Sequence, residues 1–112
     1  MSHFATTPEP PYYAVIFTSQ RTAGDRGYGV TASRMVELAQ EIPGYLGIES
    51  ARDPEGLGIT VSYWSSPEAI AEWRCQIEHL SAQHRGKSEW YQRYQLRVAK
   101  VERAYSGPAG RG

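Results

Sequence analysis

Two histidines in the second half of the chain are the side chains best suited to move a proton near neutral pH. His84 falls within the arc of one predicted helix that also holds Ile70, Trp73 and Ile77. A histidine on this apolar face can act as a general base toward a bound ligand. It can equally hydrogen-bond a backbone carbonyl near the helix end, or gain from the helix dipole.

His79 is the second candidate, and it lies six residues after Trp73. Six residues rotate a helix by about 240° relative to the first side chain, so His79 points away from the centre of the apolar stripe. The side chain is either a surface or interface histidine, or a proton shuttle at the rim of a pocket.

Aromatic residues are numerous, with three Trp and eight Tyr among 112 residues. Trp73 is expected either in the core or as the wall of a pocket, because a large rigid indole suits a flat aromatic ligand. The other residues predicted to contact such a ligand are Tyr63, Trp90, Tyr94 and Ile77. For most of these side chains, packing in the core or in a dimer is the alternative.

Composition excludes several classes of partner and cofactor. Twelve basic residues balance twelve acidic ones, so no charge draws the chain to nucleic acid or to a membrane surface. A single cysteine, Cys75, and scattered histidines do not form a zinc site, and no glycine-rich loop has the spacing of a phosphate-binding motif. We expect no metal, and a cytoplasmic location, since the first residues do not resemble a signal peptide.

The pattern along the chain predicts strands at residues 12–19, 45–52, 57–64 and 90–103, and a helix at residues 31–42. Ser66 and Pro67 begin a second helix, which Gly86 ends, while residues 21–30 read as a loop. The order βαββαβ predicts an α+β, ferredoxin-like fold, with two helices on one face of a four-stranded antiparallel sheet. Residues 1–11 are expected to form a flexible arm, residues 12–105 the domain, and residues 106–112 a flexible tail.

The first strand predicts a homodimer. Two helices cover only one face of the sheet, yet both faces of this strand are apolar, with Tyr13, Val15 and Phe17 alternating with Tyr12, Ala14 and Ile16. A second copy of the chain is the simplest cover for the far face. The alternative is that the N-terminal arm folds over it.

Several stretches of this sequence resemble the antibiotic biosynthesis monooxygenase family, within it the branch similar to haem-degrading monooxygenases. The matching residues are Pro43-Gly44-Tyr45-Leu46-Gly47, Tyr63-Trp64, Ser66-Pro67-Glu68-Ala69, Trp73, His79, Gly86, Trp90-Tyr91, Tyr94 and the segment VAKVERAY at residues 98–105. The resemblance implies a dimeric α+β barrel in which each subunit holds a pocket between its sheet and its helices.

The resemblance also implies an activity, for which three hypotheses remain. The first is a monooxygenase that oxygenates a small aromatic substrate without metal or flavin. The second is haem binding and haem degradation, although that branch places its histidine ligand at position 83, where this chain has Gln83, and its first-strand asparagine has no counterpart here. The third is a dimer that binds a small molecule without catalysis.

Overall fold

The computed structural model of the chain describes residues 4–24, 28–84 and 91–108, with the side chains of residues 31 and 78–84 left undescribed. Its elements, in chain order, are β1 (Tyr12–Arg21), α1 (Tyr28–Glu41), β2 (Tyr45–Arg52), β3 (Leu57–Trp64), α2 (Pro67–His84) and β4 (Tyr91–Val101). The predicted βαββαβ order is confirmed, and β2 and β3 have the predicted bounds.

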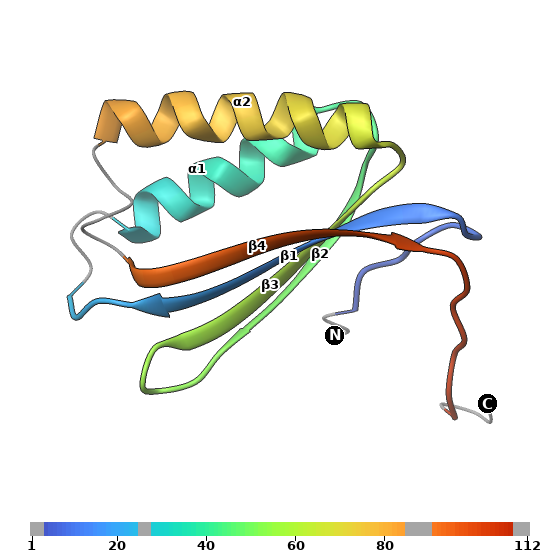
Figure 1. The fold of residues 1–112 in the computed structure, drawn as a ribbon, viewed down its shortest axis with the longest axis horizontal. Coiled ribbons are helices and arrows are strands. Elements are labelled where there is room, and N and C mark those ends of the chain that lie inside the picture. Colours follow the sequence, from blue (N-terminus) through green and yellow to red (C-terminus); the bar gives the residue numbers. More distant parts are fainter. Residues whose placement is uncertain (1–3, 25–27, 85–90, 109–112) are drawn as a thin grey trace.

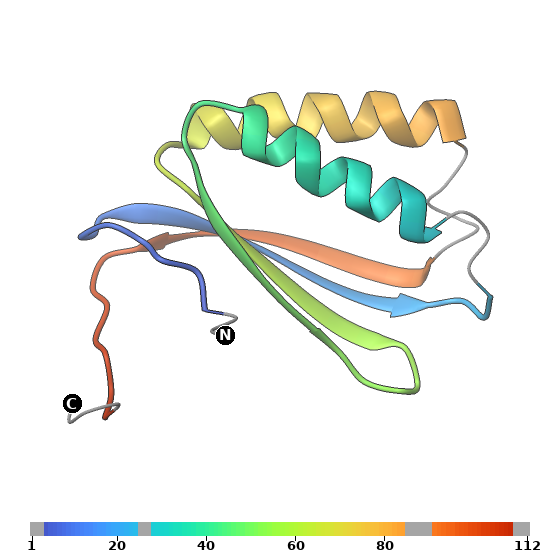
Figure 2. The same cartoon turned by 180° about the vertical axis from the view of Figure 1, so that it is seen from behind.

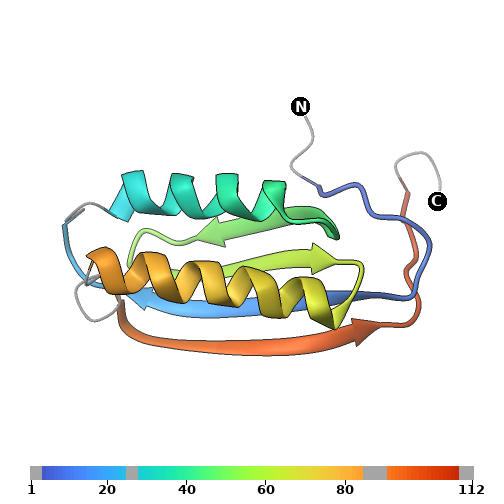
Figure 3. The ribbon, with the colours of Figure 1, turned by 90° about the horizontal axis from the view of Figure 1, so that it is seen from above.

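The four strands form one sheet in the order β2-β3-β1-β4, in which all neighbours are antiparallel. Both helices lie on one face of this sheet, as Figures 1 and 2 show from opposite sides. Seen from above, α2 runs along the middle of the sheet, and β4 forms an edge that neither helix covers (Figure 3). The predicted ferredoxin-like arrangement is therefore confirmed.

The first helix begins at Tyr28, three residues before the predicted start at residue 31. The ring of Tyr28 packs edge-on against Tyr91, with 5.8 Å between centroids, and the Arg21 guanidinium lies over the Tyr28 ring, 3.8 Å from its centroid. Tyr91 is distant from Tyr28 in sequence, so local pattern could not reveal that contact. The second helix begins as predicted, since Ser66 Oγ accepts a hydrogen bond from the backbone N–H of Ala69 at 3.2 Å.

The turn between β2 and β3 is fixed by one side chain. Asp53 Oδ1 accepts hydrogen bonds from the backbone N–H groups of Glu55, at 3.0 Å, and Leu57, at 2.9 Å. Gly56 adopts a φ of +100°, which favours glycine. This turn sets the register of the hairpin, in which Arg52 lies opposite Gly58 and Ser50 opposite Thr60.

The shared register arranges the helix-facing residues in rows that cross the sheet. The rows are Ile48, Ser62, Val15 and Val98, then Ser50, Thr60, Phe17 and Leu96, then Arg52, Gly58, Ser19 and Tyr94. Beyond the first row, Trp64 is fully buried at the centre of the core. The other buried residues of that core are Val15, Ala39, Ile42, Ala69 and Ile70.

The N-terminal arm lies on the opposite face of the sheet, below it in Figure 1. The backbone N–H of Ala5 donates to Glu49 Oε2 at 2.9 Å, and Thr7 Oγ1 donates to the Tyr12 hydroxyl at 3.1 Å. Gly47 allows this approach, because a Cβ there would lie 2.7 Å from the Cβ of Ala5. Residues 4–11 thus cover part of the face that strand β1 leaves apolar.

Candidate functional site

A cavity of about 400 Å³ lies between the sheet and the two helices. Its lining is mostly apolar, with five aromatic side chains and a few hydroxyl groups. The lining residues are Val15, Phe17, Tyr28, Ala32, Met35, Val36, Ile48, Ser50, Thr60, Ser62, Trp73, Arg74, Ile77, Tyr91, Tyr94 and Leu96. This volume is within the range of sites that bind small organic molecules.

Three of the predicted ligand-contacting residues line this cavity, namely Trp73, Ile77 and Tyr94. Trp73 also packs on the core, with its ring 5.1 Å from that of Trp64. Both interpretations of Trp73, core residue and pocket wall, therefore hold for one side chain. Its Nε1 is a buried donor with no acceptor in the part of the chain that the structure describes.

Tyr63 lies on the opposite face of the sheet, so its predicted place in the pocket needs correction. Side chains alternate along a strand, and the neighbouring Trp64 occupies the helix side. The Tyr63 hydroxyl donates to Glu49 Oε1 at 2.6 Å, and its ring packs edge-on against Tyr12. Burial, followed by this hydrogen bond, raises the pKa of Tyr63 to about 12.

The other three predicted site residues fall outside what the structure describes. His79 and His84 belong to the last turns of α2, where only the backbone is described, and Trp90 precedes the described part of β4. Their roles as bases and as a pocket residue stay predictions.

Two phenols that the predictions did not assign to the site, Tyr28 and Tyr91, lie in contact with each other in the cavity wall. The hydroxyls of Tyr28 and Tyr91 are hydrogen-bonded, and burial together with this bond raises the pKa of Tyr91 far above its ordinary value. Tyr91 is thus a neutral donor at physiological pH. The ring of Phe17 packs against both Tyr91, at 5.3 Å, and Tyr94, at 5.5 Å. Tyr28 was missed because it follows a glycine-rich segment that reads as a loop.

The floor of the cavity carries hydroxyl groups on β2 and β3. Ser50 and Thr60 hydrogen-bond each other at 2.8 Å, while Ser62 Oγ accepts from Trp64 Nε1 at 2.9 Å. These three side chains are short, so the sheet recedes from the helices at this point. The floor can therefore accommodate a flat molecule and offer it a few weak polar contacts.

Among the described side chains, those of residues 4–24, 28–30, 32–77 and 91–108, no group of three or more His, Cys, Asp or Glu that could hold a metal ion is found. Neither of the described helices is long and apolar enough to cross a membrane.

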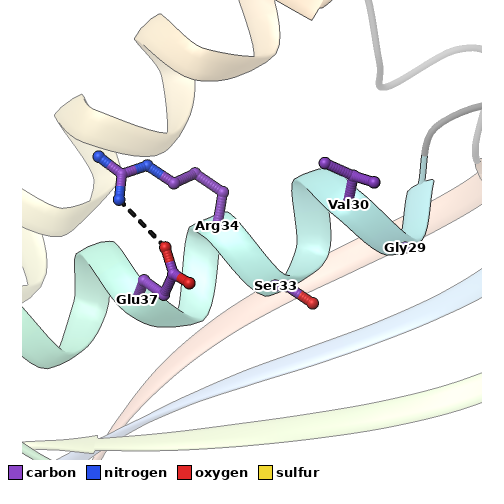
Figure 4. Close-up of a pocket in the computed structure, with 5 residues that line it drawn as sticks. All are labelled: Gly29, Val30, Ser33, Arg34 and Glu37. Atoms are coloured by element: carbon purple, nitrogen blue, oxygen red, sulfur yellow. Dashed lines mark hydrogen bonds and ion pairs between the residues drawn. The ribbon is translucent and has the colours of Figure 1, made fainter.

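A second hollow lies on α1 and is lined by Gly29, Val30, Ser33, Arg34 and Glu37 (Figure 4). Arg34 Nη1 and Glu37 Oε1 form an ion pair at 3.1 Å, and both side chains are exposed. One helix supplies every lining residue, so this surface does not enclose a ligand. The cavity between sheet and helices is the better candidate site.

Comparison with solved structures shows the same fold in oxygenases. A variant of SnoaB, a cofactor-independent oxygenase from Streptomyces nogalater, superposes with a TM-score of 0.68 at 7% identity, covering 83% of this chain and 95% of that one. A candidate antibiotic biosynthesis monooxygenase from Chloroflexus aurantiacus gives a TM-score of 0.58 at 20% identity, covering 88% and 99%. These likenesses cover most of the chain, and they establish the shared architecture.

Comparison of sequences gives a nearer relative. No family model matches the chain. The uncharacterized protein YqjZ of Bacillus subtilis is 56% identical over 103 residues, which cover 92% of this chain and 90% of YqjZ. Since this identity extends over nearly the whole length of both proteins, the chain belongs to the YqjZ family.

Proposed function

We propose that the chain is a homodimeric monooxygenase of the antibiotic biosynthesis type, which oxygenates a small aromatic substrate without metal or flavin. The observation that carries this proposal is the cavity of about 400 Å³, whose walls include Phe17, Trp73 and Tyr94. Aromatic walls around an apolar space suit a flat, electron-rich ring system.

The fold supports the same proposal, because SnoaB is a cofactor-independent oxygenase built on this architecture. Fold alone does not determine a reaction, so the chemistry has to come from the cavity. Oxygenation without a cofactor requires a substrate that can itself reduce oxygen. The protein then supplies a base, a dry cavity and donors for the developing anion.

The reaction proceeds through the substrate carbanion. A base removes a proton from an activated CH₂ group, and the carbanion transfers an electron to O₂. Recombination of the two radicals and protonation give a hydroperoxide, which loses water to leave a carbonyl group. One oxygen atom enters the product and the other leaves as water, so no external reductant is needed.

We assign the following residues to these steps. Tyr91 and Tyr94, which both line the cavity, are the proposed hydrogen-bond donors to the substrate oxygen. Trp73 provides the stacking wall. His84 and His79 are the proposed bases, with Trp90 as a further donor.

The test is oxygen consumption with anthrone, a three-ring ketone with an activated CH₂ group. The purified chain, treated with a chelator and free of flavin, should consume one O₂ per anthrone and form anthraquinone. One atom of ¹⁸O from ¹⁸O₂ should appear in each product molecule. A rate that does not exceed the protein-free autoxidation of a panel of anthrones and hydroxynaphthalenes would contradict the proposal.

The bases are tested with single histidine variants. His84→Ala should lower kcat by about 10²-fold or more, as expected for loss of a general base, and His79→Ala by less. His3→Ala is the matched control, since the chain has three histidines. Turnover by His84→Ala at the wild-type rate would remove this residue from the mechanism.

The dimer is proposed from the face of the sheet that the helices do not cover. There β3 presents Leu57, Ile59 and Val61, while its helix-facing residues include Thr60 and Ser62. A face in contact with water would show the reverse pattern. Leu57 and Ile59 are 49% and 48% exposed in the single chain.

Sedimentation should give twice the 12.5 kDa mass of the chain. Ile59→Lys should shift the mass toward one chain, because burying a lysine in the interface is unfavourable. Val30→Lys, at an exposed position of α1, is the control and should keep the dimer. A wild-type mass of one chain at micromolar concentration would rule out the homodimer.

Haem titration separates the other two hypotheses. No histidine or cysteine stands among the described lining residues, so the structure identifies no such iron ligand. A saturable one-to-one Soret shift, abolished by His84→Ala, would replace the proposal with haem binding. Failure of both the anthrone and the haem assays would favour a dimer that binds a small molecule without catalysis.

A further inference from the structure

Positive charge gathers at the end of the cavity nearest the β2–β3 turn. The third row of helix-facing residues, next to the Ser50 and Thr60 floor, contains Arg52, Gly58, Ser19 and Tyr94. Tyr94 is the member of this row that lines the cavity, whereas Arg52, Gly58 and Ser19 are not among the lining residues, so the row lies just beyond the cavity end.

Arg52 is held across the sheet by its neighbours. Its Nη2 donates to Ser19 Oγ at 2.8 Å, and its Nη1 donates to the backbone oxygens of Ser19, at 3.4 Å, and Gly56. The guanidinium lies above Gly58, where a Cβ would come within 2.5 Å of Cζ and 2.9 Å of Nε. A side chain at position 58 would therefore displace the Arg52 guanidinium, which occupies the space that Gly58 leaves open.

The Arg52 guanidinium has N–H donors that remain available to bind an anion. Of its five N–H bonds, the Nε–H and the second Nη2–H find no acceptor among residues 4–24, 28–84 and 91–108, the undescribed side chains of residues 31 and 78–84 aside. These two bonds share one edge of the guanidinium, the edge that binds a carboxylate through two parallel hydrogen bonds. Within the same described ranges Arg52 forms no ion pair, since the oxygens it contacts belong to Ser19 and Gly56.

The surroundings also favour a negative charge. The described lining residues include Arg74 and no acidic residue. The Arg21 guanidinium lies over the Tyr28 ring, 3.8 Å from its centroid. Burial raises the pKa of Tyr91, and the charges of Arg52 and Arg21 oppose that rise, so both cations are within electrostatic reach of this phenol.

We propose that the cavity binds an aromatic carboxylate, with the ring system between Trp73 and Phe17 and the carboxylate on Arg52. This inference rests on the proposed function only in taking the cavity as the substrate site. It narrows the substrate to aromatic acids, and it makes Arg52 a specificity residue that anchors the ligand away from the reacting carbon.

The test compares 2-naphthoate with 2-naphthamide, two probes of nearly equal shape that differ in charge and do not react with oxygen. Calorimetry should show that the wild type binds 2-naphthoate more tightly. Arg52→Gln should lower the affinity for 2-naphthoate by about tenfold and change that for 2-naphthamide by less than about twofold, because it removes one charge-assisted contact. Raising the salt concentration should weaken only 2-naphthoate binding.

Two further variants control the result. Gly58→Ala should reproduce the selective loss, because the added Cβ displaces the guanidinium without removing its charge. Arg34→Gln removes an exposed arginine of α1 that pairs with Glu37, and it should leave both affinities unchanged. Equal affinity of the wild type for the two probes, no binding of either, or equal losses in Arg52→Gln would overturn the proposal.

The binding assay is independent of catalysis. If no anthrone or hydroxynaphthalene is oxygenated while Arg52 still selects 2-naphthoate, the proposed reaction fails and the anion site stands. If oxygenation is observed but Arg52→Gln binds both probes with the same affinities as the wild type, the proposed reaction is supported and the proposed anion site is wrong.

Discussion

At one end of the interface between helices and sheet, Trp64 is fully buried among Ala39, Ile42 and Ala69, and the two layers touch. At the other end, beyond Ser62, the same two layers enclose a cavity. Figure 1 shows the sheet turning away from α2 between these ends. The closed end provides stability and the open end provides space for a ligand, although the same elements build both.

Strand β3 accounts for much of this difference. Its helix-facing residues are Trp64, Ser62, Thr60 and Gly58, in order from the closed end to the open end. The large indole fills the space under the helices, the two small hydroxyl residues leave it open, and glycine admits Arg52 from the neighbouring strand. A single strand can thus combine a core with a binding site when a large side chain at one end is followed by small ones.

Of the substitutions that distinguish the closed end from the open end, the one at Trp64 should change stability most. Trp64→Ala should lower the free energy of unfolding by about 3–5 kcal/mol, because it removes a buried indole and leaves a hole in the core. Urea denaturation followed by circular dichroism measures the change. Tyr105→Ala, at a side chain that is 86% exposed, is the control and should stay within about 0.5 kcal/mol of the wild type. A loss below about 1 kcal/mol in Trp64→Ala would mean that the closed end is not the stabilising core.

Two alanines of α1, seven residues apart, sharpen the contrast. Ala39 is fully buried at the closed end, and Ala32 lines the cavity. Ala39→Leu should cost about 1–3 kcal/mol through overpacking. Ala32→Leu should leave stability within about 1 kcal/mol of the wild type, because the cavity accepts the added atoms, while 2-naphthamide binding is lost. If thermal unfolding showed equal destabilisation by the two substitutions, the two ends would not differ in packing as described.

The smallest effect is expected on the far side of the sheet, where Tyr63 contacts Glu49 and neither end of the interface is touched. Tyr63→Phe should cost about 1 kcal/mol at pH 7, the usual value of one hydrogen bond. The pKa of Tyr63 is raised to about 12, so the stabilisation that depends on its neutral form is complete below the ordinary value near 10 and is lost as pH rises through 12.

Denaturation of the wild type and Tyr63→Phe at several pH values checks this sign. The difference in stability between the two proteins should be constant up to about pH 10 and should shrink toward pH 12. A difference that widens in alkali would show that the Tyr63 phenolate is stabilised by the fold. Ligand binding should be unaffected, since Tyr63 lies away from the cavity.

Sequence predicted the architecture well because local signals decide it. Residues 45–52 and 57–64 have strand propensity on either side of a turn that Asp53 and Gly56 define, so both strands have the expected bounds. The start of α2 followed from the hydroxyl of Ser66. The start of α1 differed most, since contacts of Tyr28 with Arg21 and Tyr91 extend that helix, while β1 runs two residues further than predicted and the described β4 ends at Val101.

The site was predicted less completely because alternation identifies two faces of a strand without saying which one meets the helices. For β3 the apolar set that includes Tyr63 faces away from the helices, and the smaller, more polar set faces the cavity. Trp73 and Ile77 were found because helical periodicity marks the buried side of α2 directly. Arg52 gave no signal, since its position depends on the absence of a side chain on the adjacent strand.

The Asp53 turn has a consequence for how this protein tolerates insertions and deletions. One residue more or fewer between β2 and β3 would shift the pairing by one and rotate every side chain of a strand to its other face. Ile59, Val61 and Tyr63 would then point at the helices, and Thr60 and Ser62 would point outward. The length of a short exposed turn therefore determines whether the molecule contains a binding site at all, and homologues that keep the site should keep this length.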